Sequence, residues 1–114
     1  MFAESANSGL AALEATKAMA EEKYVIVRDS RAGVYFGRLV AFSATDKTAR
    51  LIDARNIHTW NGRLSTADIA ARGIGRGSNV TRAAPAIELL DVVSVLECSD
   101  EAIKSALEYP SWSE

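Results

Sequence analysis

Residues 24–42 read YVIVRDSRAGVYFGRLVAF and contain two strand patterns separated by a turn. Its first five residues are a β-branched run that is typical of a strand. Residues 34–42 alternate between two sets of side chains, as the two faces of a second strand would. Residues 29–33 combine Asp, Ser and Gly, which favour a turn. The stretch therefore predicts two antiparallel strands joined as a hairpin.

Two later segments also have strand character. Residues 45–47 predict a turn into a third strand over 48–60, which is long enough to contain a bend or bulge around 54–56. Asn61 and Gly62 end that strand, because this pair accepts the positive φ angles of a tight turn. Residues 86–96 place apolar groups on both faces, so we expect them to form a central strand that is covered on both sides.

Three segments have the composition of helices. Residues 8–22 are rich in Ala, Leu, Glu, Lys and Met and contain no interior Pro. Residues 66–72 follow Ser65, which suits an N-cap, and stop at Gly73. Residues 100–108 follow Ser99 in the same way and stop before Pro110. We therefore predict one N-terminal helix and two shorter helices.

Together these segments predict an α+β fold: a small antiparallel β-sheet of four to five strands with an N-terminal helix, a short middle helix and a C-terminal helix. At 114 residues the chain is sized for one domain. We expect residues 1–22 to form a helical extension and residues 23–114 a single ligand-binding domain. The sequence contains neither a secretory signal nor a membrane span, so we expect a cytosolic protein.

The charges are sorted along the chain. All nine arginines lie between Arg28 and Arg82, where they and one lysine face only four aspartates, although the whole chain has a net charge of −2. A guanidinium can grip a phosphate with two parallel hydrogen bonds, so the cluster indicates anion recognition. The acidic flanks and a sequence pI near 5.4 argue against a long nucleic acid. A small phosphorylated ligand fits this charge pattern better.

Catalytic and metal-binding groups are scarce. The only histidine, His58, and the only cysteine, Cys98, fall in separate predicted strands, and no serine has the motif of an activated nucleophile. One cysteine cannot form an internal disulfide, and a closed zinc site would be hard to build. We predict a protein that is not an enzyme and that uses no metal or cofactor.

Six residues are candidates for binding the anion: Arg28, Arg55, Trp60, Arg76, Asn79 and Arg82. Arg55 falls in a half-buried strand and needs a partner there, for which Asp53 is one choice. Trp60 offers a flat face for a base, although a tryptophan at a strand end is also typical of a core or an interface. Residues 73–79 (GIGRGSN) could leave backbone amides open to an anion, or could form a plain surface loop.

Short motifs spread over residues 23–112 carry a family resemblance: 23–28 (KYVIVR), 32–39 (AGVYFGRL), 53–55 (DAR), 90–92 (LDV), and Trp60, Gly62, Leu64, Ser65, Ile69, Ala70, Gly73, Cys98 and Trp112. They are similar to motifs of small phage and prophage proteins. Within that group the chain resembles the Thoeris anti-defence sponges, which sequester a cyclic ADP-ribose signal made by bacterial TIR enzymes and thereby keep the defence effector off.

The resemblance implies a cytoplasmic protein of an infected bacterium that traps the signal without cleaving it. It also implies a homo-oligomer whose pockets hold phosphates with arginines and adenine against an aromatic or guanidinium face. Arg55 matches that pattern best. The chain departs from it in residues 55–60 (RNIHTW), where similar proteins often have a second arginine and a second aromatic residue, and at Arg82, where an aromatic residue is expected.

Two other interpretations stay open. The arginines could belong to a structural or protein-binding accessory domain of phage origin, with an acidic partner such as the C-terminal part of a neighbouring copy. Weak DNA or RNA binding is the third interpretation, and a steep loss of affinity with salt would be its mark.

Overall fold

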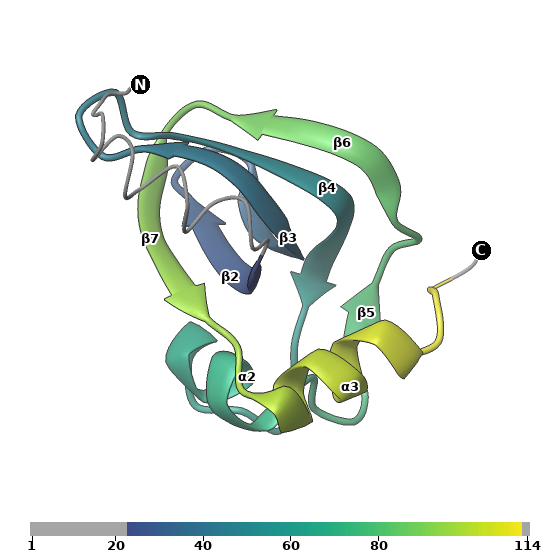
Figure 1. The fold of residues 1–114 in the computed structure, drawn as a ribbon. Helices are drawn as coiled ribbons and strands as arrows, with labels where there is room; N and C mark the ends of the chain where they lie inside the picture. The colour runs from purple at the N-terminus through teal and green to yellow at the C-terminus, as the bar shows by residue number, and fades with distance from the viewer. Residues whose placement is uncertain (1–22, 113–114) are drawn as a thin grey trace.

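The computed structural model describes residues 23–112, which form a six-stranded antiparallel sheet and two short helices (Figure 1). In chain order these are β2 (Lys23–Asp29), β3 (Gly33–Ser43), β4 (Thr48–Thr59), α2 (Thr66–Arg72), β5 (Asn79–Val80), β6 (Ala84–Leu89), β7 (Val92–Glu97) and α3 (Asp100–Glu108). The fold is mostly sheet, so the prediction of an α+β fold with four to five strands was wrong. The predicted helix over 8–22 lies outside the described residues.

The sheet curves because of how its outer strands are connected. β3 pairs with one side of β4, while the other side pairs with β6 along its first half and with β5 along its second half. At the opposite end of the sheet, β7 pairs with β2. Only Leu90 and Asp91 separate β6 from β7, so the sheet bends round until its two ends meet at that turn (Figure 1).

The predicted hairpin is confirmed as β2 and β3, in register from Lys23↔Leu39 to Asp29↔Gly33. Gly33 has a φ of 100°, a backbone conformation that favours glycine. The Asp29 carboxylate closes the turn, because its Oδ1 accepts hydrogen bonds from two backbone N–H groups of the turn at 2.8 Å each. The turn predicted over residues 29–33 is therefore confirmed.

The predicted central strand over 86–96 was wrong, because this segment forms two strands at opposite ends of the sheet. Asp29 Oδ2 accepts a hydrogen bond from Asp91 N at 2.9 Å, and Ser30 N donates to Asp91 O at 3.0 Å. These bonds hold the chain in a turn between β6 and β7. Two of the apolar residues that suggested burial, Leu90 and Val93, are 71% and 56% exposed.

Apolar side chains form two clusters on opposite faces of the sheet. The first joins the sheet to the helices and contains Ile26, Val34, Phe36, Ile57, Ile69, Ala70, Ile74, Val80 and Ala106. The second is built by strands and contains Val25, Val27, Ala49, Leu51, Ala54, Leu89 and Val92. Adjacent residues of a strand point to opposite faces, so β2 places Val25 in one cluster and Ile26 in the other. β2 is thus a strand that is covered on both faces.

A β-bulge at Asp53 makes β4 change faces. Leu51 and Ala54 belong to the strand-only cluster although they are three residues apart, whereas Ile57 belongs to the helix-side cluster. The register between β3 and β4 shifts at this point, and Asp53 has a φ of 52°. The irregularity predicted near residues 54–56 is therefore confirmed. Its consequence is that Arg55 lies on the same face as Ile57, toward α3.

The two short helices begin and end at the predicted residues. The Ser65 hydroxyl accepts a hydrogen bond from Asp68 N at 3.4 Å, and the Ser99 hydroxyl accepts one from Ala102 N at 3.0 Å. Gly73, with a φ of 100°, ends α2. Within residues 23–112, no helix has the length and apolar character that crossing a membrane requires.

Candidate ligand-binding site

Arg55 joins β4 to the C-terminal end of the domain and is only 7% exposed. Its Nε donates to Thr81 O at 2.8 Å, and its Nη1 donates to Ala106 O at 2.7 Å and to Tyr109 O at 2.8 Å. Nη2 lies 3.4 Å from Ser111 Oγ. The guanidinium therefore connects three segments: β4 itself, the residues around Thr81, and the C-terminal end of α3 with the residues that follow it.

The charge of Arg55 is balanced by dipoles. All four of its acceptors are neutral oxygens, and the predicted partner Asp53 instead accepts a hydrogen bond from Arg38 Nη2 at 2.8 Å. Burial lowers the pKa of the Arg55 guanidinium below its ordinary value. Because the last turn of α3 contains no basic residue, Arg55 supplies the positive charge that a helix C-terminus attracts.

A cavity of about 420 Å³ opens beside this guanidinium. It is lined by Tyr24, Phe36, Asp53, Arg55, Arg82, Ala83, Leu107, Tyr109 and Ser111. The rings of Tyr24 and Phe36 are stacked, with centroids 5.2 Å apart and planes at 9°. The described residues thus give this cavity two cations, one carboxylate and an aromatic wall, which is a net positive charge with an apolar side.

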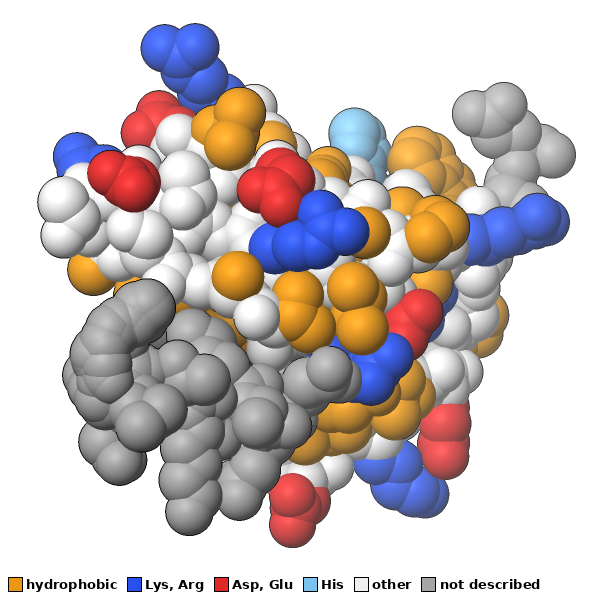
Figure 2. All heavy atoms as spheres, turned by 45° about the horizontal axis from the view of Figure 1, so that its top comes forward, with side chains coloured by type: hydrophobic (Ala, Val, Ile, Leu, Met, Phe, Trp, Pro, Cys, Tyr) orange, Lys and Arg blue, Asp and Glu red, His pale blue; other side chains and the backbone are white. Residues whose placement is uncertain are grey.

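Most arginines elsewhere in residues 23–112 have local partners. The carboxylate pairs are Arg31–Asp91, Arg38–Asp53, Arg50–Glu88 and Arg72–Asp68. Arg63 donates to backbone carbonyls. On the face drawn in Figure 2, basic side chains lie next to acidic ones and form no continuous basic surface. The clustering of arginines in the sequence therefore does not become one basic patch on that face.

The structure brings two of the six predicted residues to the same cavity, Arg55 and Arg82. Sequence reasoning missed Tyr24, Leu107 and Tyr109, which line it as well. Tyr24 precedes the β-branched run of the first strand and Tyr109 directly follows the last helix. No local pattern indicates that the curved sheet places these residues together.

The other four predicted residues lie elsewhere. Arg28 is exposed on β2 and Arg76 is exposed in the turn before β5, and neither makes an ion pair or a side-chain hydrogen bond within residues 23–112. Trp60 is exposed just after β4. Asn79 Nδ2 donates to Thr59 Oγ1 at 3.0 Å.

The glycines of residues 73–79 serve packing. A Cβ on Gly75 would overlap Asn61 O, so only glycine lets these two backbone segments lie so close together. Ile74 N donates to Ser105 Oγ at 3.0 Å, and Ser78 N donates to Gly75 O at 3.2 Å. The geometry supports the simpler of the two interpretations, a well-packed loop, over a phosphate cradle.

His58 and Cys98, which carry the two reactive types of side chain, both have surroundings that explain them without a catalytic role. The ring of His58 stacks on that of Trp112, with centroids 5.1 Å apart. Burial raises the pKa of the Cys98 thiol to about 12, so it stays protonated near neutral pH. Across the described part of the chain, no three His, Cys, Asp or Glu side chains gather in a group that could hold a metal ion.

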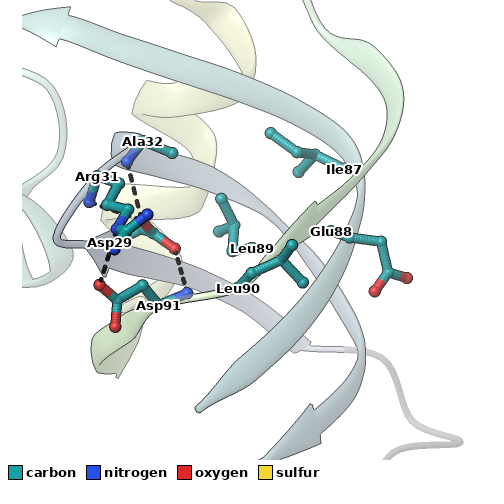
Figure 3. Close-up of a pocket in the computed structure, with 8 residues that line it drawn as sticks. All are labelled: Asp29, Arg31, Ala32, Ile87, Glu88, Leu89, Leu90 and Asp91. Carbon is teal, nitrogen blue, oxygen red and sulfur yellow. Dashed lines mark hydrogen bonds and ion pairs between the residues drawn. The ribbon is translucent and has the colours of Figure 1, made fainter. Parts of the chain in front are cut away.

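A larger cavity of about 530 Å³ lies at the β2–β3 and β6–β7 turns (Figure 3). Its charged side chains are Asp29, Glu88 and Asp91 against Arg31. The Asp29 carboxylate is 4% exposed and points to the backbone N–H groups of the two turns (Figure 3). Three carboxylates against one guanidinium would repel a phosphate. The smaller, cationic cavity at Arg55 is therefore the candidate site for an anion.

The search for related proteins gives a family but no activity. Neither a curated protein nor a solved structure matches this chain. Residues 22–106 match the family model whose description is "Domain of unknown function (DUF6948)". That match covers well over half of the 114 residues, and the chain therefore belongs to this family.

Proposed function

We propose that this protein binds a small phosphorylated ligand of the cyclic-nucleotide type, such as cyclic ADP-ribose, and sequesters it without cleaving it. The observation that carries the proposal is the guanidinium of Arg55, which is buried among neutral acceptors at a cavity that Arg82 also lines. A buried cation without a counter-ion creates a field that favours an anion in the adjoining cavity.

The lining of the cavity suits a nucleotide better than a bare phosphate. A volume of about 420 Å³ falls within the rough range of 300–1,000 Å³ for small-molecule pockets. The stacked rings of Tyr24 and Phe36, together with Leu107, supply the apolar surface that a base or a ribose can contact. Arg82 is exposed and lacks an ion pair within residues 23–112, so it is available for a phosphate.

The biological setting of the proposal comes from the resemblance to the Thoeris anti-defence sponges. In that setting the protein acts in the cytoplasm of an infected bacterium and removes an immune signal by stoichiometric binding. A trap needs affinity and no chemistry, and charge-assisted hydrogen bonds of about 1.5–3 kcal/mol each could supply that affinity. We also propose that the protein is a homo-oligomer, as the exposed Leu90 and Val93 favour.

The first test is a calorimetric titration with cyclic ADP-ribose isomers, ADP-ribose and pyrophosphate. Arg82→Gln should weaken binding by at least about tenfold, because it removes the exposed cation of the cavity. Arg50→Gln is the matched control, since Arg50 pairs with Glu88 and does not line the cavity. Equal affinity of both variants and the wild type would contradict the assignment of this cavity.

The second test concerns the fate of the ligand. The complex with a bound cyclic ADP-ribose isomer is heated and the released compound is identified by mass spectrometry. Recovery of the intact ligand supports sequestration. Recovery of a cleaved product alone would show that the protein is not a passive trap.

A second candidate function is a structural or protein-binding accessory domain of phage origin with an arginine-rich interaction surface. Leu90 and Val93, both exposed around the start of β7, favour it because apolar patches on a surface mark contacts with other proteins. This function is preferred if no nucleotide signal raises the melting temperature while a purified host protein forms a defined complex.

A further inference from the structure

Asp53 combines three features that its neighbours do not share. It lies at the β-bulge of β4, its backbone has a φ of 52°, and its side chain lines the cationic cavity. Aside from Asp53, the charged residues among 23–112 that line this cavity are Arg55 and Arg82. A carboxylate at this place opposes the charge of the site, so its role needs its own explanation.

One oxygen of this carboxylate is occupied and the other is available. Oδ2 accepts a hydrogen bond from Arg38 Nη2 at 2.8 Å, which fixes the orientation of the group. Oδ1 accepts no hydrogen bond from any described residue, and the Asp53 side chain is 56% exposed. An oriented, ionised carboxylate of this kind accepts hydrogen bonds and cannot donate them.

The backbone at this position does not require a carboxylate. Aspartate, asparagine and glycine all accept the positive φ of residue 53, so each of them suits the bulge. The ion pair with Arg38 is partly exposed, and pairs of this kind contribute little to stability. Neither the bulge nor the ion pair therefore accounts for a carboxylate that lines the cavity.

We infer that Asp53 is a specificity-determining residue of the cavity, which selects ligands that present a hydroxyl or amino donor beside their phosphate. This inference rests on the proposed function. The two arginines attract the phosphate, while Oδ1 of Asp53 accepts a hydrogen bond from a ribose hydroxyl or a base amine. A polyphosphate without such a donor meets only repulsion from Asp53.

The test compares two probes, cyclic ADP-ribose and inorganic pyrophosphate, by calorimetry on the full chain. Asp53→Asn keeps the size of the side chain and its tolerance of a positive φ, but removes the charge. We expect Asp53→Asn to weaken the binding of cyclic ADP-ribose by at least about tenfold, because a hydrogen bond to a charged group is lost. The binding of pyrophosphate should become stronger, because a repulsion is removed. Asp46→Asn, at an exposed turn outside the cavity, should change neither affinity.

The possible outcomes distinguish the role of Asp53 from the proposed function of the protein. A ratio of the two affinities that falls in Asp53→Asn but not in Asp46→Asn supports the inference. An unchanged ratio, with binding still sensitive to Arg82→Gln, overturns the role of Asp53 and leaves the proposed function standing. Failure of the wild type to bind either probe overturns both. If Asp53→Asn does not fold, Asp53→Gly gives the same comparison, because glycine also accepts the positive φ.

Discussion

Replacing Arg55 with methionine should destabilise the domain strongly. Arg55→Met keeps most of the length of the side chain but removes every donor to Thr81 O, Ala106 O and Tyr109 O. A buried polar group that loses its partner costs about 1–3 kcal/mol, so three carbonyls would cost several kcal/mol if all stayed dry. Removing the desolvated charge offsets part of this cost. We expect a net loss of about 3–5 kcal/mol.

The loss should be measured by urea unfolding, with the fluorescence of Trp60 and Trp112 as the signal. Arg50→Met is the matched control, because the Arg50–Glu88 pair is about half exposed and should contribute less than about 1 kcal/mol. A loss within about 1 kcal/mol for Arg55→Met would contradict this prediction, because the four hydrogen bonds of Arg55 would then contribute little to stability.

The same variant should lose protection locally as well as globally. Arg55 bonds the carbonyls of Ala106 and Tyr109, so the amides of α3 and of the segment after it should exchange hydrogen faster in Arg55→Met than those of β2 and β3. Hydrogen exchange read by mass spectrometry resolves these segments. Uniform acceleration over the whole chain would show that Arg55 does not act as a local clamp.

Three further predictions concern other parts of the fold. Asp29→Asn should cost about 2 kcal/mol at neutral pH, because burial favours the neutral acid but three backbone hydrogen bonds outweigh it and hold the pKa of Asp29 below 3.8. The advantage of the wild type should be full above about pH 4 and should shrink as the pH falls through the folded-state pKa; a constant difference down to about pH 2 in urea titrations would contradict this. Cys98 in the folded protein should react about a thousandfold more slowly with a disulfide reagent near pH 8 than an ordinary thiol, because its pKa is near 12 rather than 9.0, and a fast reaction without denaturant would contradict that pKa. Gly75→Ala should lower the free energy of unfolding by at least about 2 kcal/mol because its Cβ would overlap Asn61 O, whereas Gly77→Ala meets no such overlap and should cost only the roughly 1–2 kcal/mol of an alanine at a positive φ.

The local features of the fold were predictable because short-range chemistry sets them. The hairpin of β2 and β3 follows from a β-branched run, a turn with Asp and Gly, and a second alternating run. The bounds of α2 and α3 follow from the serine caps, Ser65 and Ser99, and from the glycine that ends α2. Each of these signals lies within a few residues of the structure that it predicts.

The number of strands and the fold class were not predictable in the same way. Residues 86–96 are apolar enough to suit a single buried strand, and the break between β6 and β7 depends on Asp29, about sixty residues away in sequence. β5 is two residues long and has no pattern of its own. Tertiary contacts therefore decided both points, against the local composition.

The candidate site was also predictable only in its local features. The sequence indicated Arg55 as a buried arginine but suggested Asp53 as its partner, because the two are close in the chain. Both residues line one cavity, but the bulge at Asp53 turns Arg55 toward α3, where it donates to Ala106 O, and Asp53 accepts from Arg38 instead. Such a change of face follows from one extra residue in a strand, which alternation patterns do not reveal.

The bonding of Arg55 determines which experiment can test ligand binding. Its donors already hold α3, so a ligand would gain from its charge more than from new hydrogen bonds. Substituting Arg55 would therefore mix lost binding with lost structure, whereas Arg82 is exposed and lacks such contacts. A bound anion should also stabilise the fold, because it compensates the charge that clamps α3. Slower hydrogen exchange in α3 after addition of the ligand would therefore be a second sign that an anion binds beside Arg55.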